Sequence, residues 1–327
     1  MTKIRHLLCD LFVNPMHPLP LGVTFFERGW LSSNNVLIQD GDQAILVDSG
    51  YWTHAEQTHA LITSVLGARP LTTLINTHLH SDHCGGNSYL QLQYPQLKTR
   101  IPSGHADFVD QWDPTTLTYT PTGQHCPEFK RTSSLQNGES FVIAGKTWRV
   151  HAAPGHDPHS IILLNEEDGV LISADALWEN GFGVVFPEIE GQEAFDEVAS
   201  TLDIIERLRP QLVLPGHGAA FTDVDGAIVR ARSRLEQFRR FPEKHASYAA
   251  KVLLKFKLLE FQKIKLTDFS IWADSVNYLK LLHQTHAHGE SYNAWLIALC
   301  KSLEKSGACV LDDAYIVNTN EFRKREL

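Results

Sequence analysis

Four potential metal ligands lie within six positions of the sequence, in the stretch 77–86. They are His78, His80, Asp82 and His83. Imidazole and carboxylate donors, with no thiolate required, suit zinc, iron or manganese. Because positions i and i+2 of a helix point about 200° apart, His78 and His80 cannot share a metal ion on a helix, and an extended turn is predicted. The alternative is a run of surface histidines in a polar loop without a metal. Further metal-ligand candidates downstream disfavour this alternative.

The elements before this cluster should deliver it at the end of a strand. Residues 71–76 are predicted to form a short buried strand, and Gly85 and Gly86 let the backbone bend close to the cluster before the next helix. Upstream, apolar runs on either side of the turn at 40–42 predict a hairpin whose second strand ends at Asp48. Residues 53–66 predict a crossover helix, so strands 44–48 and 71–76 should be parallel.

The remainder of the chain predicts a second group of strands followed by helices. Strands are expected at 23–26, 141–143, 147–151, 161–164, 170–172 and 212–214, and an amphipathic helix at 195–208. Residues 98–135 contain four prolines and are expected to be mainly loop that shapes substrate access. After residue 224 helices are predicted at 227–238, 247–261, from 266 (with Thr267 as N-cap) and at 290–306, then short strands at 309–311 and 315–317.

The pattern His-x-His-x-Asp-His resembles the signature of the metallo-β-lactamase superfamily. Further landmarks follow in the family order over residues 35–220: the turn ending at His156, the strand-end Asp175 and the turn ending at His217. This resemblance implies an α+β fold, a four-layer αββα sandwich with the metals at the strand edge. The C-terminal order of helices and hairpin resembles the small winged-helix tail of some members, so a mostly helical, winged-helix-like C-terminal domain is expected.

The resemblance also implies a role for each of seven side chains. The first metal would be bound by His78, His80 and His156, the second by Asp82, His83 and His217, and both by a bridging Asp175. Two divalent ions are expected, zinc foremost, with iron or manganese as alternatives. A metal-bridging hydroxide would act as nucleophile, and Asp82 would also take a proton from the bridging water that forms it, so no Ser or Cys nucleophile is needed. Asp48 is expected to hydrogen-bond around the metal loop rather than to bind metal.

Several other histidines and cysteines lie outside this set. For His159, contact with substrate and exposure to solvent are given equal weight as expectations. Ser160 stands where several family branches have a histidine. Cys84 is predicted to be a small buried side chain. The histidines at positions 105, 125 and 151 have no ligand-like setting and are predicted to lie at the surface.

Two domains are predicted, a catalytic domain over 1–224 and a C-terminal domain over 225–327. Between positions 225 and 265 eleven Lys/Arg residues outnumber four Asp/Glu, although the net charge is −9. Arginines 230, 232, 234, 239 and 240 are expected on a solvated helix face, with contact to an anionic substrate tail as the alternative. The helix at 290–306 has no arginine, which favours a dimerisation or lid role for the tail over nucleic-acid binding, and a homodimer is one expected assembly.

Composition places the chain among ordinary soluble proteins. It is 43% hydrophobic and 20% charged, with no apolar window of about 18 residues that would predict a membrane span. The first residues lack the pattern of a secretory signal. The five cysteines (9, 84, 126, 300 and 309) are scattered without CxxC spacing, which favours a reducing cytoplasm.

These features predict a binuclear metal-dependent hydrolase of the glyoxalase-II-like kind, acting on a small-molecule thioester, ester or lactone. The chain departs from that branch in its length and in its tail, which does not resemble a glutathione-binding domain. A phosphodiesterase or ribonuclease of the same superfamily is the second hypothesis, supported by the basic belt and opposed by the acidic remainder. A metal-binding signalling protein without turnover is the third, and the intact ligand set disfavours it.

Overall fold

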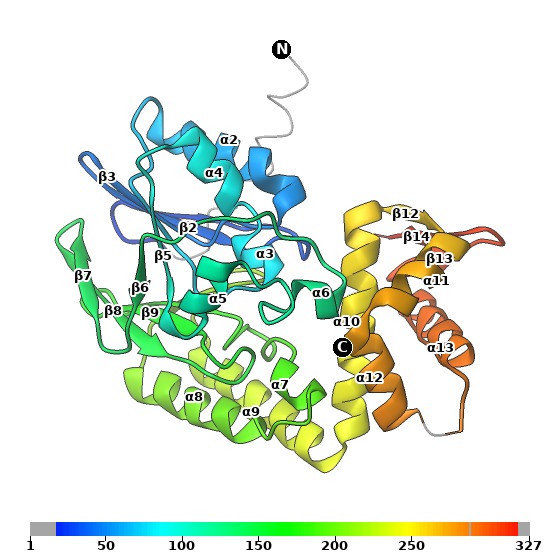
Figure 1. Ribbon diagram of the computed structural model, residues 1–327. Coiled ribbons are helices and arrows are strands. Elements are labelled where there is room, and N and C mark those ends of the chain that lie inside the picture. Colours follow the sequence, from blue (N-terminus) through cyan, green and yellow to red (C-terminus); the bar gives the residue numbers. More distant parts are fainter. Residues whose placement is uncertain (1–17, 288, 320–327) are drawn as a thin grey trace.

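Two β-sheets pack face to face at the centre of the fold, and helices cover their outer faces (Figure 1). The computed structural model describes residues 18–287 and 289–319. The predictions for Cys9 and for the first residues of the chain lie outside these described residues.

The first sheet has six strands that follow one another in sequence order. They are β1 Val23–Phe26, β2 Asn35–Asp40, β3 Gln43–Val47, β4 Thr73–Ile75, β5 Lys98–Pro102 and β6 Ser133–Leu135. The predicted hairpin joins β2 to β3, and β3 runs parallel to β4, with Ile45 paired to Thr73. The predicted crossover helix is η1 Trp52–His54 continued by α2 Ala55–Leu66, and it ends at Gly67, which has a positive φ of 62°.

The second sheet has five strands in the order β11-β10-β9-β8-β7. They are β7 Ser140–Ile143, β8 Lys146–Ala152, β9 Ile161–Asn165, β10 Val170–Ala174 and β11 Leu212–Pro215. Strands β7 to β10 form an antiparallel meander. Helices α7 Phe186–Ile189 and α8 Phe195–Leu208 then lead to β11, which lies parallel to β10.

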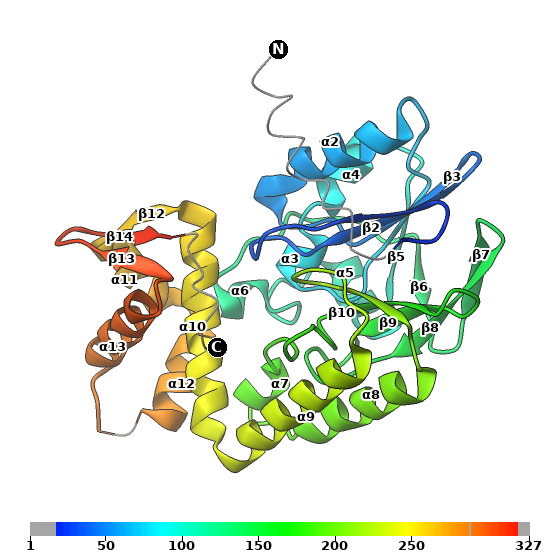
Figure 2. The same cartoon turned by 180° about the vertical axis from the view of Figure 1, so that it is seen from behind.

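Side chains alternate between the two faces of each sheet, as the two-residue period of a strand requires. In β2, Val36 lies in the core between the sheets, whereas Leu37 packs beneath helices. In β9, Leu163 faces the other sheet and Ile162 packs toward α8. Helices α2 and α4 Asn87–Gln93 cover the first sheet, and α8 and α9 Val224–Arg240 cover the second (Figures 1 and 2). The predicted four-layer αββα sandwich is therefore confirmed.

The segment 98–135, predicted to be mainly loop, contains regular structure. It supplies β5, β6, η2 Ser103–His105, α5 Ala106–Gln111 and α6 Tyr119–Thr122. The prediction was wrong for β5 because Pro102 occupies the last position of the strand, where its missing N–H removes little pairing.

The C-terminal region is mostly helical and carries a hairpin, as predicted. Its elements are α10 Pro242–Phe261, β12 Lys263–Lys265, α11 Leu266–Ser275, α12 Asn277–His286, α13 Tyr292–Lys305, β13 Cys309–Leu311 and β14 Tyr315–Asn318. Strand β14 lies between β12 and β13 in a small antiparallel sheet. The predictions missed β12 and α12, and Thr267 is not an N-cap because α11 begins one residue earlier. Within residues 18–287 and 289–319 no helix is long and apolar enough to span a bilayer.

Candidate metal centre

The histidine cluster lies in a turn at the end of β4. His78 and His80 come after the strand, and His80 has an extended backbone (φ −67°, ψ 150°) just before the short helix α3, Ser81–Cys84. Asp82 and His83 lie within that helix. A turn and not a helix therefore presents the first two histidines, as their spacing predicted.

Three other strand ends bring the downstream candidates to the same place. His156 follows β8, Asp175 follows β10 directly, and His217 follows β11. Ala174, the last residue of β10, has a left-handed backbone (φ 47°), which turns the chain at Asp175. Position 216, beside Asp175, favours glycine, because a Cβ at this position would lie 2.2 Å from Asp175 Oδ1.

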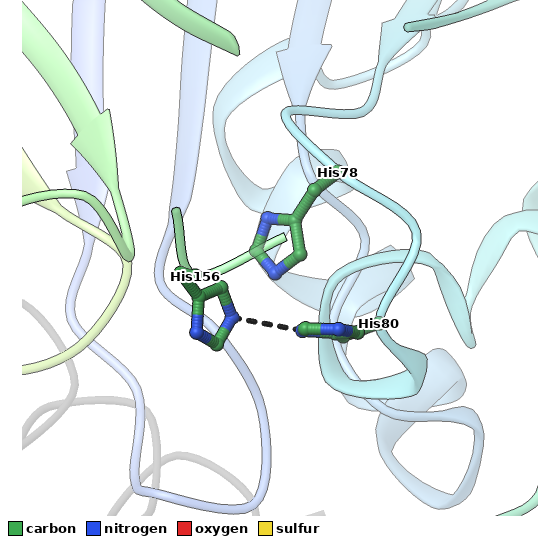
Figure 3. Close-up of side chains that lie close together, drawn as sticks. All are labelled: His78, His80 and His156. Carbon is green, nitrogen blue, oxygen red and sulfur yellow. Dashed lines mark hydrogen bonds between the residues drawn. The ribbon is translucent and has the colours of Figure 1, made fainter. Parts of the chain in front are cut away.

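The first group of ligand candidates consists of His78, His80 and His156, whose rings converge in Figure 3 and meet edge-on. His80 Nδ1 lies 2.8 Å from His156 Nε2. One nitrogen from each of the three residues lies within 4.8 Å of the other two. Three nitrogen donors that converge at one buried point fit a divalent metal ion.

The second group consists of Asp82, His83 and His217, and Asp175 lies between the two groups. His217 Nε2 is 3.1 Å from Asp82 Oδ2. Asp175 places Oδ1 3.4 Å from His83 Nε2 and Oδ2 3.4 Å from His156 Nε2. One carboxylate thus faces a side chain of each group, which is the position that a bridging ligand needs.

Three imidazole nitrogens of the ligand candidates lack a hydrogen-bond partner among the described residues. They are Nε2 of His78, Nε2 of His83 and Nδ1 of His217, and all three side chains are buried. A buried polar atom without a partner is costly, so such atoms call for an explanation. For the two Nε2 atoms, one metal ion in each ligand group supplies an explanation, because it accepts the nitrogen lone pair. The nitrogen and oxygen donors fit zinc, iron or manganese.

Burial keeps the imidazoles of the first group neutral. Burial first, and then the nearby His156 imidazole, lowers the pKa of His80 to about 3. The pKa values of His78 and His156 are also lowered, with burial the largest cause in each. A neutral imidazole has the free lone pair that metal binding needs.

At Asp175 and His83, charged neighbours outweigh the effect of burial on the pKa. Burial by itself would raise the pKa of Asp175, but the His217 and His83 imidazoles outweigh it and lower that pKa. At His83 burial lowers the pKa, whereas three carboxylates, Asp48 foremost, raise it well above its usual range. A metal ion at Nε2 of His83 would compete with a proton for this nitrogen.

Asp48 supports the metal loop from the end of β3, as predicted. Its Oδ1 accepts a hydrogen bond from the Thr77 N–H, and its Oδ2 accepts from the Thr77 hydroxyl and from His83 Nδ1, each at 2.8 Å. The Thr77 oxygen in turn accepts from His78 Nδ1 at 3.1 Å. Both histidines are thereby held with Nε2 toward the site. Asp48 itself has φ 58°, a left-handed conformation that concentrates at functional sites.

Two tryptophans that no motif marked stand beside the second group. The Trp30 ring stacks on His217 with 5.2 Å between centroids and 7° between planes, and Trp30 is 42% exposed. Trp178 contacts both rings edge-on, and its indole N–H donates to Asp175 Oδ1 at 3.2 Å. Trp178 could have been predicted near the site, because it lies three residues after Asp175 in the sequence. Trp30 could not, because it lies far from every motif in the sequence.

The four other histidines singled out in the sequence, His105, His125, His151 and His159, lie outside both ligand groups. His105, predicted at the surface, is buried, and its ring meets that of His159 edge-on at 4.5 Å. The prediction was wrong because the segment around His105 folds into short helices and not into an exposed loop. His159 and His125 are exposed, His151 is half-buried, and Ser160 is buried.

Cys84 is buried, as predicted. Its thiol contacts the Tyr119 hydroxyl at 3.2 Å and Cys126 Sγ at 3.8 Å. Burial, as the largest cause, raises the pKa of Cys84 well above its usual range. A neutral buried thiol is a poor nucleophile, so Cys84 does not compete with the metal centre for a catalytic role.

Arginines of α9 form ion pairs on the outer surface of the sandwich, as expected for a solvated helix face. The pairs are Arg230 with Asp223, Arg232 with Asp203 and Glu206, and Arg239 with Asp196. Arg234 instead lies over the ring of Tyr248, 4.6 Å from its centroid, and donates to the Asn180 carbonyl.

A sequence profile of the metallo-beta-lactamase superfamily matches residues 28–217, more than half of the chain. The protein therefore belongs to the metallo-β-lactamase superfamily, and the resemblance drawn from the His-x-His-x-Asp-His pattern is confirmed. All seven ligand candidates lie within the matched residues.

Two proteins to which the chain is similar share about a quarter of the aligned residues with it. The chain is 24% identical to an atrochrysone carboxyl ACP thioesterase of Aspergillus chevalieri, over 62% of this chain and 56% of that protein. It is 27% identical to a beta-lactamase-like protein 2 homolog of Drosophila melanogaster, over 63% of this chain and 66% of that protein. The alignment with the Aspergillus thioesterase thus spans only about half of that relative's length.

Most of the chain has a structural counterpart. A metallo-beta-lactamase family protein from Thermus thermophilus superposes with a TM-score of 0.53 at 20% identity, over 92% of this chain and 99% of that chain. This likeness shows a shared fold.

Proposed function

We propose that this protein is a metal-dependent hydrolase that cleaves small-molecule thioesters, with esters and lactones as related substrates. The observation that carries the proposal is the pair of ligand groups with Asp175 between them at one edge of the sandwich. Distant relatives named as thioesterases of an acyl carrier protein support the choice of a thioester.

The seven side chains have assigned roles in this proposal. His78, His80 and His156 would hold one divalent ion, Asp82, His83 and His217 would hold a second, and Asp175 would serve as a ligand for both. Zinc is the first choice, with iron and manganese as alternatives. When bound, such ions would lower the pKa of a bound water and polarise the scissile carbonyl.

Asp82 is the carboxylate best suited to move a proton. Its side chain is 14% exposed, compared with 7% for that of Asp175, so it lies closer to the opening of the site. Its Oδ2 contacts His217 Nε2 at 3.1 Å. We assign to Asp82 the removal of a proton from the attacking water, in addition to its role as ligand.

The tryptophans beside His217 provide an apolar surface for the substrate. Trp30 is partly exposed and meets Trp178 edge-on at 5.3 Å. Such a surface suits an apolar acyl group and keeps water from one side of the centre.

Phosphodiester or RNA hydrolysis is the second candidate, because the C-terminal elements follow a winged-helix-like order. Its electrostatic support is weak. Three of the arginines in the basic stretch are engaged in ion pairs, which leaves fewer charges for phosphate groups.

Domain organisation and location are also proposals. The predicted boundary was 224/225, but α9 packs into the core that covers the second sheet. We therefore propose that the catalytic unit extends through α9 and that the C-terminal unit begins with α10. Four described cysteines are free thiols, with Cys84 and Cys126 close together, which fits a reducing compartment such as the cytoplasm.

The test is hydrolysis of a panel of substrates by the zinc-loaded protein: an acyl thioester, a lactone, a phosphodiester and single-stranded RNA. We expect thioester or lactone turnover, lost by at least about 100-fold in Asp175→Ala because each ion loses a ligand. Turnover of RNA or the phosphodiester alone would replace the first function by the second. Metal binding without turnover of any substrate would favour the signalling alternative.

A further inference from the structure

One short segment connects the C-terminal region to the metal centre. Residues 183–186, called here the bridging segment, run along His156. A Cβ at Gly183 would lie 2.4 Å from His156 Nδ1, so only glycine fits beside the ring. The Val184 carbonyl accepts a hydrogen bond from His156 Nδ1, and the Phe186 N–H donates to the His156 carbonyl at 3.3 Å.

Helix α10 holds the bridging segment from its other side. The Val185 N–H donates to His245 Nε2 at 3.1 Å, and both groups are buried. Val184 packs in the apolar core of the C-terminal region, whereas Val185 packs in the core beneath α8 and α9. The Phe186 ring also contacts Tyr278 of α12, with 5.8 Å between centroids.

The two hydrogen bonds belong to a single peptide group. The carbonyl of Val184 and the N–H of Val185 share one peptide bond, which is planar and trans, so they point in opposite directions. The carbonyl binds His156 on one side and the N–H binds His245 on the other. Any rotation of this peptide plane that improves one bond disturbs the other, so the two histidines are mechanically linked.

We propose that His245 is a positioning residue for the metal ligand His156, acting through the peptide group between Val184 and Val185. The partner of a ligating histidine's second nitrogen fixes its tautomer and ring orientation. Here that partner is the Val184 carbonyl, and His245 fixes the carbonyl in turn. The inference rests on the proposed metal centre and makes the C-terminal region part of its support.

The setting of His245 fits this role. It is 4% exposed and lies among aromatic rings, 5.0 Å from Phe238 and 5.3 Å from Phe195. Burial, as the largest cause, lowers the pKa of His245 to about 4, so the ring is neutral at pH 7 and its Nε2 can accept a hydrogen bond. The sequence contained no sign of this residue, because it lies 60 positions from Val185.

The test measures metal binding by the full-length protein, without any substrate. Metal-stripped wild type and variants are titrated with zinc against a chelator, and the visible absorption of the cobalt(II) form reports ligand geometry. His245→Leu should weaken binding of one of two ions about tenfold and change the cobalt spectrum. His245→Gln should restore most of the affinity, since its amide oxygen can accept near the Nε2 position.

Phe195→Leu is the matched control, because it loosens the same aromatic cluster without touching the bond to Val185. It should lower stability and leave zinc affinity unchanged. Wild-type affinity and spectrum in His245→Leu, or an equal loss of affinity in Phe195→Leu, would overturn the positioning role while the metal centre stands. A wild type that binds no zinc would overturn both the centre and the inference.

Discussion

Asp48 joins two histidines that belong to different ligand groups. It binds His83 Nδ1 directly and reaches His78 through the Thr77 hydroxyl. An asparagine keeps the shape of this side chain but replaces one acceptor oxygen with a donor. Asp48→Asn should therefore weaken zinc binding about 10- to 100-fold, measured by competition with a chelator. Asp42→Asn, in the exposed turn between β2 and β3, is the control, and equal affinity in both variants would contradict the role of Asp48.

The buried His245 also predicts a dependence of stability on pH. Its pKa is about 4 in the folded protein and about 6.5 in the unfolded chain, so the unfolded chain binds the extra proton between these values. Stability contributed by neutral His245 is therefore complete above pH 6.5 and declines as the pH falls toward 4. At pH 5 the loss is about 2 kcal/mol.

Urea unfolding of the metal-free protein at pH 7 and pH 5 measures this loss. His245→Gln has no titrating group at the position, so its unfolding free energy should fall less between the two pH values. Parallel pH profiles for wild type and His245→Gln would show that His245 titrates normally in the folded state.

At the scale of elements, the site depends on four strand ends that meet at one edge of the sandwich. Gly216, after β11, lies against the Asp175 carboxylate, since a Cβ there would lie 2.2 Å from Asp175 Oδ1. Gly216→Ala should displace Asp175 and lower the affinity for both ions at least about tenfold, by chelator competition. Gly29→Ala, where a Cβ meets open space, is the control. Retention of two tightly bound ions in Gly216→Ala would show that the strand ends have more freedom than the structure indicates.

The strands and ligands that could be predicted are those whose signals are local. Apolar runs bounded by turns predicted β2, β3, β9 and β10, and the spacing of His78 and His80 predicted a turn at the end of β4. Strand β12 could not be predicted, because its three residues gain a partner only when β14 packs beside it. The same holds for Trp30 and His245, whose roles come from contacts with residues far away in sequence.

Across the whole molecule, a partly buried polar network ties the C-terminal region to the sandwich. The Tyr51 hydroxyl donates to Glu260 Oε1 at 3.1 Å, and Lys257 donates to the other oxygen of Glu260 at 3.0 Å. The Trp272 indole N–H, near Lys257, donates to the Gly123 carbonyl at 3.1 Å. This network joins α10 and α11 to loops of the first sheet.

Tyr51→Phe tests that network. It removes one bond from a largely buried carboxylate, so the unfolding free energy should fall by about 2 kcal/mol, measured by urea denaturation. Tyr315→Phe serves as the control, because the Tyr315 hydroxyl makes no hydrogen bond within the described residues. Equal stability of Tyr51→Phe and wild type would mean that apolar packing alone holds the two regions together.

The number of metal ions per chain tests the account most directly. Elemental analysis after zinc loading and removal of excess metal should give two ions per chain for the wild type. His217→Ala removes a ligand from the second group only, so it should retain one ion, held by His78, His80 and His156. A wild type with one ion or none, or a His217→Ala variant that keeps both, would contradict the assignment of seven side chains to a binuclear centre.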